Sequence, residues 1–110
     1  MYIKYEASIE NEAIKANLKR LTNQIYKLLP SWEEASDWRK PLTTIIIEFS
    51  GMDRLFLDHH TILFALLCKL EGLFTLDDSN DEDKHNFFIF RKTIFECLSL
   101  VNDLGNTICH

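Results

Sequence analysis

The chain has 110 residues, of which 46% are apolar and 26% are charged, and its formal net charge is −5. This length suits one domain with a single core, and these ordinary globular values argue against a disordered chain. The sequence holds only 3 glycines and 2 prolines, which argues against an all-β sandwich because such folds need many tight turns. The composition therefore favours long helices.

The charge is unevenly placed, since residues 1–40 carry a net +1 and residues 41–110 a net −6. This balance disfavours binding of nucleic acid by the whole surface. The N-terminal segment is too polar for a signal peptide, and the longest uncharged apolar run, residues 61–68, is too short to span a membrane. We therefore expect no membrane partner.

The three cysteines, Cys68, Cys97 and Cys109, form an odd set without the spacing of a metal site. A secreted disulfide scaffold would carry a denser, even set, so this pattern favours a reducing, cytoplasmic compartment. Cys68 and Cys97 stand inside apolar runs, and we expect both to be small core residues.

Residues 2–9 alternate between apolar and polar types, which is the period of a strand. A lone strand would need a partner, such as the same segment of a second copy. A helical or frayed lead-in is the interpretation that we favour. From Asn11 the period becomes helical and predicts a bundle helix that ends at Pro30. Its apolar seam is Ile14, Leu18, Leu21, Ile25 and Leu28.

A short helix from Trp32 towards Trp38 is predicted by Ser31 and Glu34, which form a capping-box pattern. The two tryptophans are spaced to share one face of this helix.

The next predicted helix begins near Pro41, because proline suits the first turn of a helix. The run Thr43–Ile47 within it is entirely β-branched, and such a run prefers strands. The helical period continues on both sides of the run, so we keep the helix. Its apolar face is Leu42, Ile45, Ile46, Phe49, Met52 and Phe56.

A third long helix is predicted from His59 to about Glu71, with Asp58 as its N-cap and Gly72 as its stop. Residues 62–70 are apolar nearly all round the helix, which is typical of a central position.

An acidic loop, residues 77–83, precedes the last helix and contains a second capping-box pattern at Ser79 and Glu82. The last helix is predicted to end at Gly105. Its apolar face is Phe87, Phe90, Ile94, Cys97, Val101 and Leu104. Short links between these helices predict an all-α fold, a small antiparallel bundle of about four main helices plus a short connecting helix, in one domain over residues 1–110.

No metal site and no cofactor are expected. His59 and His60 are adjacent, and neighbours on a helix point about 100° apart, so they do not present two ligands to one ion. The acidic loop fails the EF-hand pattern, because Glu82 or Asp83 stands where that pattern requires glycine.

No catalytic residue is expected either. The serines stand in no nucleophile elbow, and the scattered glycines form no phosphate-binding loop. One alternative remains open, a ligand sensor or enzyme whose site lies between helices near Glu48, Glu71 and Glu96.

A basic stripe on the first long helix is one candidate binding determinant, although a solvated polar face is the simpler interpretation. It consists of Lys15, Lys19, Arg20 and Lys27. Such a stripe suits phosphates or an acidic protein surface. In a second nucleic-acid alternative, the acidic loop would mimic DNA. The loop's acids are Asp77, Asp78, Asp81, Glu82 and Asp83.

An excess of large apolar residues is the second candidate determinant. Three runs are apolar around the whole helix: Ile45–Ile47, Leu55–Leu57 and the segment that contains Phe87, Phe88 and Phe90. One small core does not hide so much apolar surface, so we expect another chain to cover part of it.

These patterns predict a non-enzymatic protein that binds another protein, with a second copy of itself among the partners, and acts as a small regulator or stoichiometric inhibitor. The small size and acidity also suit the anti-defence inhibitors of phages and mobile elements. Binding of nucleic acid is the less favoured alternative.

Overall fold

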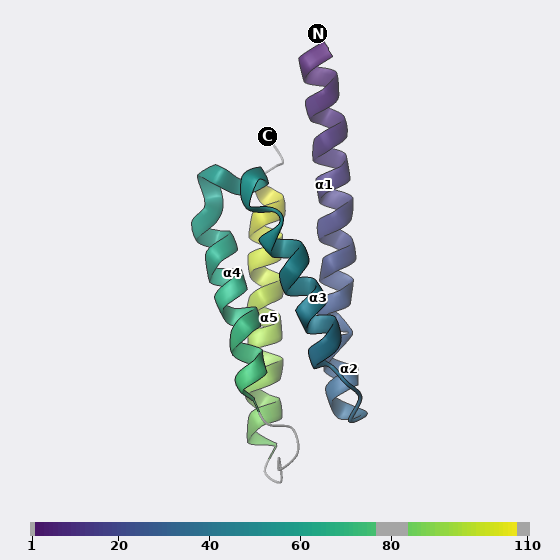
Figure 1. Cartoon of the computed structure of the whole chain (residues 1–110), viewed down its shortest axis with the longest axis vertical. Coiled ribbons are helices and arrows are strands. Elements are labelled where there is room, and N and C mark those ends of the chain that lie inside the picture. The colour runs from purple at the N-terminus through teal and green to yellow at the C-terminus, as the bar shows by residue number, and fades with distance from the viewer. Residues whose placement is uncertain (1, 77–83, 108–110) are drawn as a thin grey trace.

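The computed structural model describes residues 2–76 and 84–107, with side chains described from residue 11 onward. Every regular element in these ranges is a helix (Figure 1). The α-helices are α1 (Tyr2–Tyr26), α2 (Leu28–Glu33), α3 (Arg39–Ser50), α4 (His60–Gly72) and α5 (His85–Asn106), and two 3-10 helices, η1 (Asp53–His59) and η2 (Leu73–Thr75), flank α4. The predicted all-α class is confirmed.

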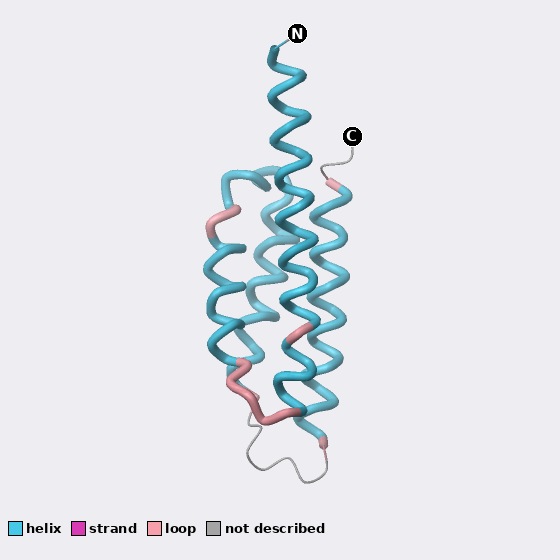
Figure 2. The backbone as a smooth tube through the Cα atoms, turned by 90° about the vertical axis from the view of Figure 1, so that its right-hand side faces the viewer, coloured by secondary structure: helices cyan, strands magenta, loops and turns pink. Residues whose placement is uncertain are grey.

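The helices α1, α3, α4 and α5 pack around one core, and neighbouring helices run in opposite directions (Figures 1 and 2). The short helix α2 lies at the lower end of the bundle, and η1 crosses its upper end (Figure 1). The molecule measures 60 × 23 × 18 Å. Its long axis follows α1, whose first turns extend beyond the other helices (Figure 1).

The core is built from the apolar stripes of these helices, and no polar or charged side chain among the described residues is buried. The predicted seam of α1 is confirmed, with Leu18, Leu21 and Ile25 buried and Ile14 packed against them. On α5 the predicted face is also buried, apart from Phe87, which is half-buried. Its core residues are Phe90, Ile94, Cys97, Val101 and Leu104. The helix continues to Asn106, past the predicted stop.

The chain around Pro30 departs from the prediction. Helix α1 ends earlier, at Tyr26, and Pro30 lies in the first turn of α2, where its missing N–H removes no helical hydrogen bond. Ser31 lies inside α2 and is no N-cap, because its hydroxyl donates to the carbonyl oxygen of Lys27 at 3.0 Å. Helix α2 then stops, and Ala35 adopts a left-handed φ of 58°.

A cluster of aromatic side chains packs at the lower end of the core. The Trp32 ring of α2 lies 5.2 Å from the Trp38 ring and 4.5 Å from the Phe90 ring of α5, measured between centroids. Trp38 stands just before α3, so the two tryptophans meet in space without sharing one helix as predicted. Both are buried, and they join α2 and α3 to α5.

The β-branched run Thr43–Ile47 lies inside α3, so the helix predicted for this run is confirmed. Its predicted continuation to Phe56 is wrong, because α3 ends at Ser50 and Phe56 lies in η1. The Thr43 hydroxyl donates to the carbonyl oxygen of Arg39 at 2.9 Å, the back-bond that threonine makes within helices. Ile45 is fully buried. The apolar face of α3 therefore outweighs the strand preference of the individual residues.

Two predictions for α4 are wrong. Asp58 lies inside η1, and the residue before α4 is His59, which makes no side-chain cap. Nor is α4 central, because α3 and α5 cover only one side of it, leaving Phe64 65% exposed and Cys68 exposed. Its buried residues are Leu63, Leu66 and Leu70. Helix α4 therefore carries more apolar side chains than the core buries.

Candidate functional site

The groove between α1 and α5 and the neighbouring outer side of α5 carry exposed aromatic and basic side chains, and we call these two areas together the α1–α5 face. Helix α1 contributes Lys15, Lys19, Thr22 and Tyr26, and helix α5 contributes Phe88, Arg91, Lys92 and Phe95. The spacing of three or four residues within each set places its members on one side of their helix. The antiparallel packing of the two helices then brings the sets together.

Two shallow hollows follow this face along the helices. The first has a volume of about 350 Å³ and is lined by α1 residues that include Lys15, Lys19 and Thr22, with Leu98 and Asn102 of α5 opposite. The second has a volume of about 440 Å³ and lies on α5. Its lining residues are Phe88, Arg91, Lys92, Phe95, Glu96 and Ser99. Phe95, which lines the second hollow, contacts Tyr26 of α1, so the second hollow lies beside the contact between the two helices.

The aromatic residues of the face touch one another across the two helices. The Tyr26 and Phe95 rings meet edge to face, with centroids 6.2 Å apart and planes at 79°. The Arg91 guanidinium lies over the Phe95 ring, 5.2 Å from its centroid, which is a cation–π distance. Tyr26, Phe95 and Phe88 nevertheless remain 46%, 41% and 66% exposed. Tyr26 and Phe95 thus form an aromatic pair that the bundle itself does not cover, and Phe88 is exposed in the same hollow as Phe95 without a ring contact among the described residues.

The predicted basic stripe of α1 is split by the structure. Lys15 and Lys19 lie on the α1–α5 face. Arg20 turns to α3 instead, where its Nη2 lies 2.9 Å from Oε1 of Glu48, and it also donates to the side chain of Asn17. Lys27 is exposed in the turn between α1 and α2. Only two of the four cations therefore share a surface with the aromatic residues.

The three phenylalanines singled out from the sequence have three different environments. Phe90 is fully buried in the aromatic cluster, so it offers nothing to a partner, and that part of the prediction is wrong. Phe87 is half-buried, with its ring centroid 6.3 Å from that of Trp32. Phe88 alone points to the surface. The predicted acidic-loop residues, 77–83, lie outside the described residues.

Six other large apolar residues of the described ranges are exposed away from the α1–α5 face, and Phe74 and Ile89, at 36% each, are the least exposed of them. Ile47 of α3, Leu55 and Leu57 of η1, and Phe64 of α4 are 65%, 53%, 68% and 65% exposed. Leu55 borders a hollow of about 590 Å³ with the small residues Ala13 and Ala16 of α1. The four most exposed of these residues are spread over three elements.

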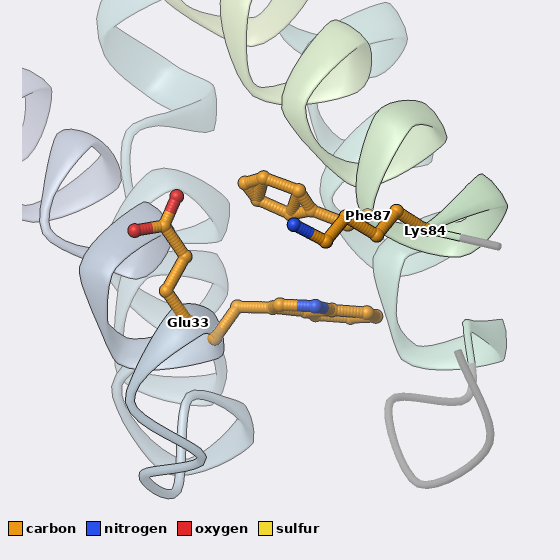
Figure 3. Close-up of a pocket in the computed structure, with 4 residues that line it drawn as sticks. Glu33, Lys84 and Phe87 are labelled. Atoms are coloured by element: carbon orange, nitrogen blue, oxygen red, sulfur yellow. The ribbon is translucent and has the colours of Figure 1, made fainter. Parts of the chain in front are cut away.

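A further hollow, of about 460 Å³, lies between α2 and the start of α5 (Figure 3). Glu33 borders it from α2, while Lys84 and Phe87 border it from the α5 side, and Trp32 completes the lining. An aromatic wall with a carboxylate at the rim suits a small cationic molecule. Because Glu33 and Lys84 are exposed, this hollow has no buried polar group to orient such a molecule.

The carboxylates considered for an interhelical site take separate partners. Oε1 of Glu48 pairs with Arg20 between α1 and α3, and its Oε2 is buried without a hydrogen-bond partner in the described ranges. Oε2 of Glu96 lies 3.4 Å from Nζ of Lys69 between α4 and α5. Glu71 is exposed on α4. The structure thus provides no shared carboxylate site for these three residues.

The two described cysteines differ sharply. Burial raises the pKa of the Cys97 thiol to about 12; among its neighbours Lys69 lowers this pKa and Glu96 raises it. The thiol therefore stays protonated at neutral pH and is a poor nucleophile. Cys68 is exposed on α4, so the prediction that it is a core residue is wrong. Within the described ranges, no three His, Cys, Asp or Glu residues are grouped to hold a metal ion.

Comparison with known proteins identifies no relative: no family model, curated protein or solved structure matches this chain. Among the described helices, none has the length and apolar content that a membrane span requires. The α1–α5 face is therefore assessed on its own geometry. Sequence reasoning missed Arg91 and Phe95 as part of it, although their spacing from Phe88, on the side of the helix away from its core stripe, was a usable signal.

Proposed function

We propose that the protein is a non-enzymatic interaction module that binds another protein through the α1–α5 face. The observation that carries this proposal is the contact between two exposed rings on different helices, Tyr26 and Phe95, with the Arg91 guanidinium over one of them. Phe88 is exposed in the same hollow as Phe95. Aromatic residues and arginine are the types most enriched at protein interfaces and at their energetic hot spots. A single exposed ring needs no explanation, but a cluster held together across two helices favours a covering partner.

The rigidity of the two helices supports the same proposal. Tyr26 lies at the end of α1, where the buried Ile25 and Leu28 fix the backbone, and Phe95 follows the fully buried Ile94. The rings are therefore held by packed elements before a partner arrives, which lowers the entropy lost on binding. A preformed surface of this kind suits a small regulator or stoichiometric inhibitor, which acts by occupying its target.

The biological setting remains part of the proposal. We place the protein in the cytoplasm, because an exposed thiol such as Cys68 suits a reducing compartment. A second copy is one possible partner. An anti-defence inhibitor of a phage or mobile element is the specific regulator type that we propose for a chain of this size and acidity.

The test compares two matched substitutions. Phe88→Ala and Phe64→Ala remove the same side chain at nearly equal exposure, 66% and 65%, from the α1–α5 face and from α4 respectively. The tagged full chain and its variants are used for quantitative capture from lysate of the source cells, and their mass in solution is measured by light scattering. We expect a retained protein, or self-association, that Phe88→Ala with Phe95→Ala abolishes and Phe64→Ala preserves.

Two results would contradict the proposal. The first is a monomeric chain whose retained proteins are the same for all variants. The second is loss of a partner through Phe64→Ala alone, which would move the interface to α4. Circular dichroism of each variant confirms that the helices are intact, as expected for substitutions of exposed residues.

A further inference from the structure

The charges on the α1–α5 face are opposite in sign to the protein as a whole. The chain has a net charge of −5, whereas this face carries four cations, Lys15, Lys19, Arg91 and Lys92. Among the described residues, Glu96 is the one carboxylate that lines either hollow, and it pairs with Lys69 of α4 at the edge of the face. A partner that covers this face therefore meets positive charge.

The cations stand on both sides of the aromatic contact. Tyr26 and Phe95 lie at the level where α1 ends; Lys15 and Lys19 lie earlier on α1, and Arg91 and Lys92 lie one turn earlier on α5. Because the helices are antiparallel, the two cation pairs lie on opposite sides of the ring pair along the groove. An apolar centre flanked by charged groups is the usual arrangement of a protein-binding hot spot and its rim.

Arg91 is placed to bind a carboxylate of a partner. Its guanidinium carbon lies 5.2 Å from the centroid of the Phe95 ring, a cation–π distance, while Arg91 itself remains exposed. The planar edge of arginine binds a carboxylate through two parallel hydrogen bonds, which a lysine does not reproduce. The Phe95–Arg91 pair thus joins an apolar anchor to a carboxylate-binding group.

The shape of the face suits a helix. From Lys15 to Tyr26 the groove follows α1 for about 16 Å, at about 1.5 Å per residue, which is the length of a helix of about three turns. The valley between two antiparallel helices accepts a third helix, as in helix-in-groove recognition, where apolar residues at spacings of three and four enter the groove.

We propose that the partner segment is an amphipathic helix whose apolar stripe is bordered by Asp or Glu. The stripe would cover Tyr26, Phe95 and Phe88, and the acids would meet the flanking cations. This inference rests on the proposed function and names the chemistry of its partner. Single-stranded nucleic acid is less favoured, because four cations set against an overall charge of −5 give little phosphate attraction.

The experiment is a display selection with random peptides of about 16 residues, long enough for about four helical turns. The full chain is the bait, and the double variant Phe88→Ala with Phe95→Ala is used to remove peptides that bind elsewhere. We expect the enriched peptides to carry apolar residues at helical spacing with Asp or Glu beside them. With the charge-reversed bait, Arg91→Glu with Lys92→Glu, the acids in the enriched peptides should be replaced by Lys or Arg.

One enriched peptide is then synthesised with a fluorescent label, and its affinity is measured by anisotropy. We expect Phe95→Ala to weaken binding by about tenfold or more, as for a hot-spot residue, and Phe64→Ala to change it by less than about twofold. Raising the salt from about 50 mM to about 300 mM should weaken binding several-fold, because the flanking charges are exposed.

The outcomes separate this inference from the proposed function. Enriched peptides that depend on Phe95 but lack acids would overturn the acidic partner and leave the interaction module standing. No enrichment over the double variant would overturn both. A labelled oligothymidine that binds the wild-type chain but not the charge-reversed variant, without acidic peptides being enriched, would assign the face to nucleic acid. Self-association through the face that an acidic peptide cannot displace would assign it to a second copy.

Discussion

The α1–α5 face and the outer surface of α3, η1 and α4 expose similar amounts of apolar side chain in very different arrangements. On the α1–α5 face, three rings and a guanidinium lie against one another or in one groove. On the other surface, Ile47, Leu57 and Phe64 are at least as exposed but belong to separate elements. The arrangement of exposed apolar residues, and their association with charge, thus indicates a binding surface better than their number.

The same contrast explains why the apolar residues around α4 are not by themselves a site. Phe64 is followed one turn later by the exposed Cys68, and the cation nearest along the helix, Lys69, pairs with Glu96. A partner would find there one ring with no second exposed ring in contact with it among the described residues. The α1–α5 face offers both kinds of group within one groove.

The largest expected effect is on stability, and it distinguishes a buried phenylalanine from an exposed one two residues away on α5. Phe90→Ala should lower the free energy of unfolding by about 3–5 kcal/mol, because Phe90 is fully buried against Trp32 and Trp38. Phe88→Ala should change it by no more than about 0.5 kcal/mol, because the side chain is 66% exposed. Urea denaturation followed by circular dichroism measures both. Equal losses would show that Phe88 is part of the core.

A second prediction uses the cysteines in a chain that carries Cys109→Ser. A maleimide should label Cys68 rapidly and leave Cys97 unlabelled under native conditions, since burial raises the pKa of the Cys97 thiol to about 12. A bulky adduct on Cys68 should leave binding at the α1–α5 face unchanged. Mass spectrometry of the labelled protein and anisotropy with a selected peptide test the two statements. Loss of binding on labelling would extend the interface to α4.

The pKa of Cys97 also predicts a pH dependence of stability. The folded-state pKa of about 12 lies above the ordinary value of 9.0 that applies to the unfolded chain. The unfolded state therefore releases this proton first as pH rises. The contribution of the protonated thiol is complete below about pH 9 and is lost between about pH 9 and about pH 12. Urea titrations of the wild type and of Cys97→Ala should differ by an amount that shrinks across this window.

The fold was largely predictable because the buried residues of its helices recur at spacings of three and four. The apolar seam of Leu18, Leu21 and Ile25 and the face of α5 were visible as spacings of three and four, and both are buried. The β-branched run in α3 was also assigned correctly, because the helical spacing of the apolar residues around it was a stronger signal than the strand preference of β-branched residues. The errors fall at helix ends and in the position of α4, which is not central. Pro30 and Asp58 were read as a stop and a cap, although proline is also tolerated in a first turn and aspartate also occurs within 3-10 helices.

The candidate face was less predictable, because it depends on which helices are neighbours. The sequence grouped Arg20 with Lys15 and Lys19, yet Arg20 faces α3 and pairs with Glu48. It also grouped Phe90 with Phe88, although one points inward and the other outward. Only the packing of α1 against α5 brings Tyr26 to Phe95, since these residues are far apart in the chain. Periodicity shows which side of a helix is apolar but not what lies opposite.

A smaller effect, on peptide binding, is expected from the two lysines of the basic stripe that lie on the α1–α5 face. Lys15→Glu with Lys19→Glu should weaken binding of an acidic peptide by several-fold to about tenfold, mainly through slower association at low salt. Lys27→Glu, outside the face, should have an effect several-fold smaller. Stopped-flow association at two salt concentrations distinguishes them. A loss of binding free energy in the double variant that is only about twice the loss in Lys27→Glu, in proportion to the change in net charge, would mean that the peptide responds to the net charge of the protein alone.

The smallest expected effect concerns the ion pair that takes Arg20 away from the face. Glu48→Gln keeps the shape of the side chain but removes the charge that faces Arg20 at 2.9 Å. The pair is partly exposed, so its loss should lower the free energy of unfolding by no more than about 1 kcal/mol. Part of this loss should be offset, because the buried Oε2 of Glu48 has no hydrogen-bond partner in the described ranges and an amide is less costly to bury. Arg20 lies on the α3 side of α1, so releasing it should not strengthen binding of an acidic peptide at the α1–α5 face. An increase in affinity in Glu48→Gln would show that the binding surface extends around α1 to α3. In that case the ion pair with Glu48, and not the position of Arg20 on α1, keeps Arg20 from an acidic partner.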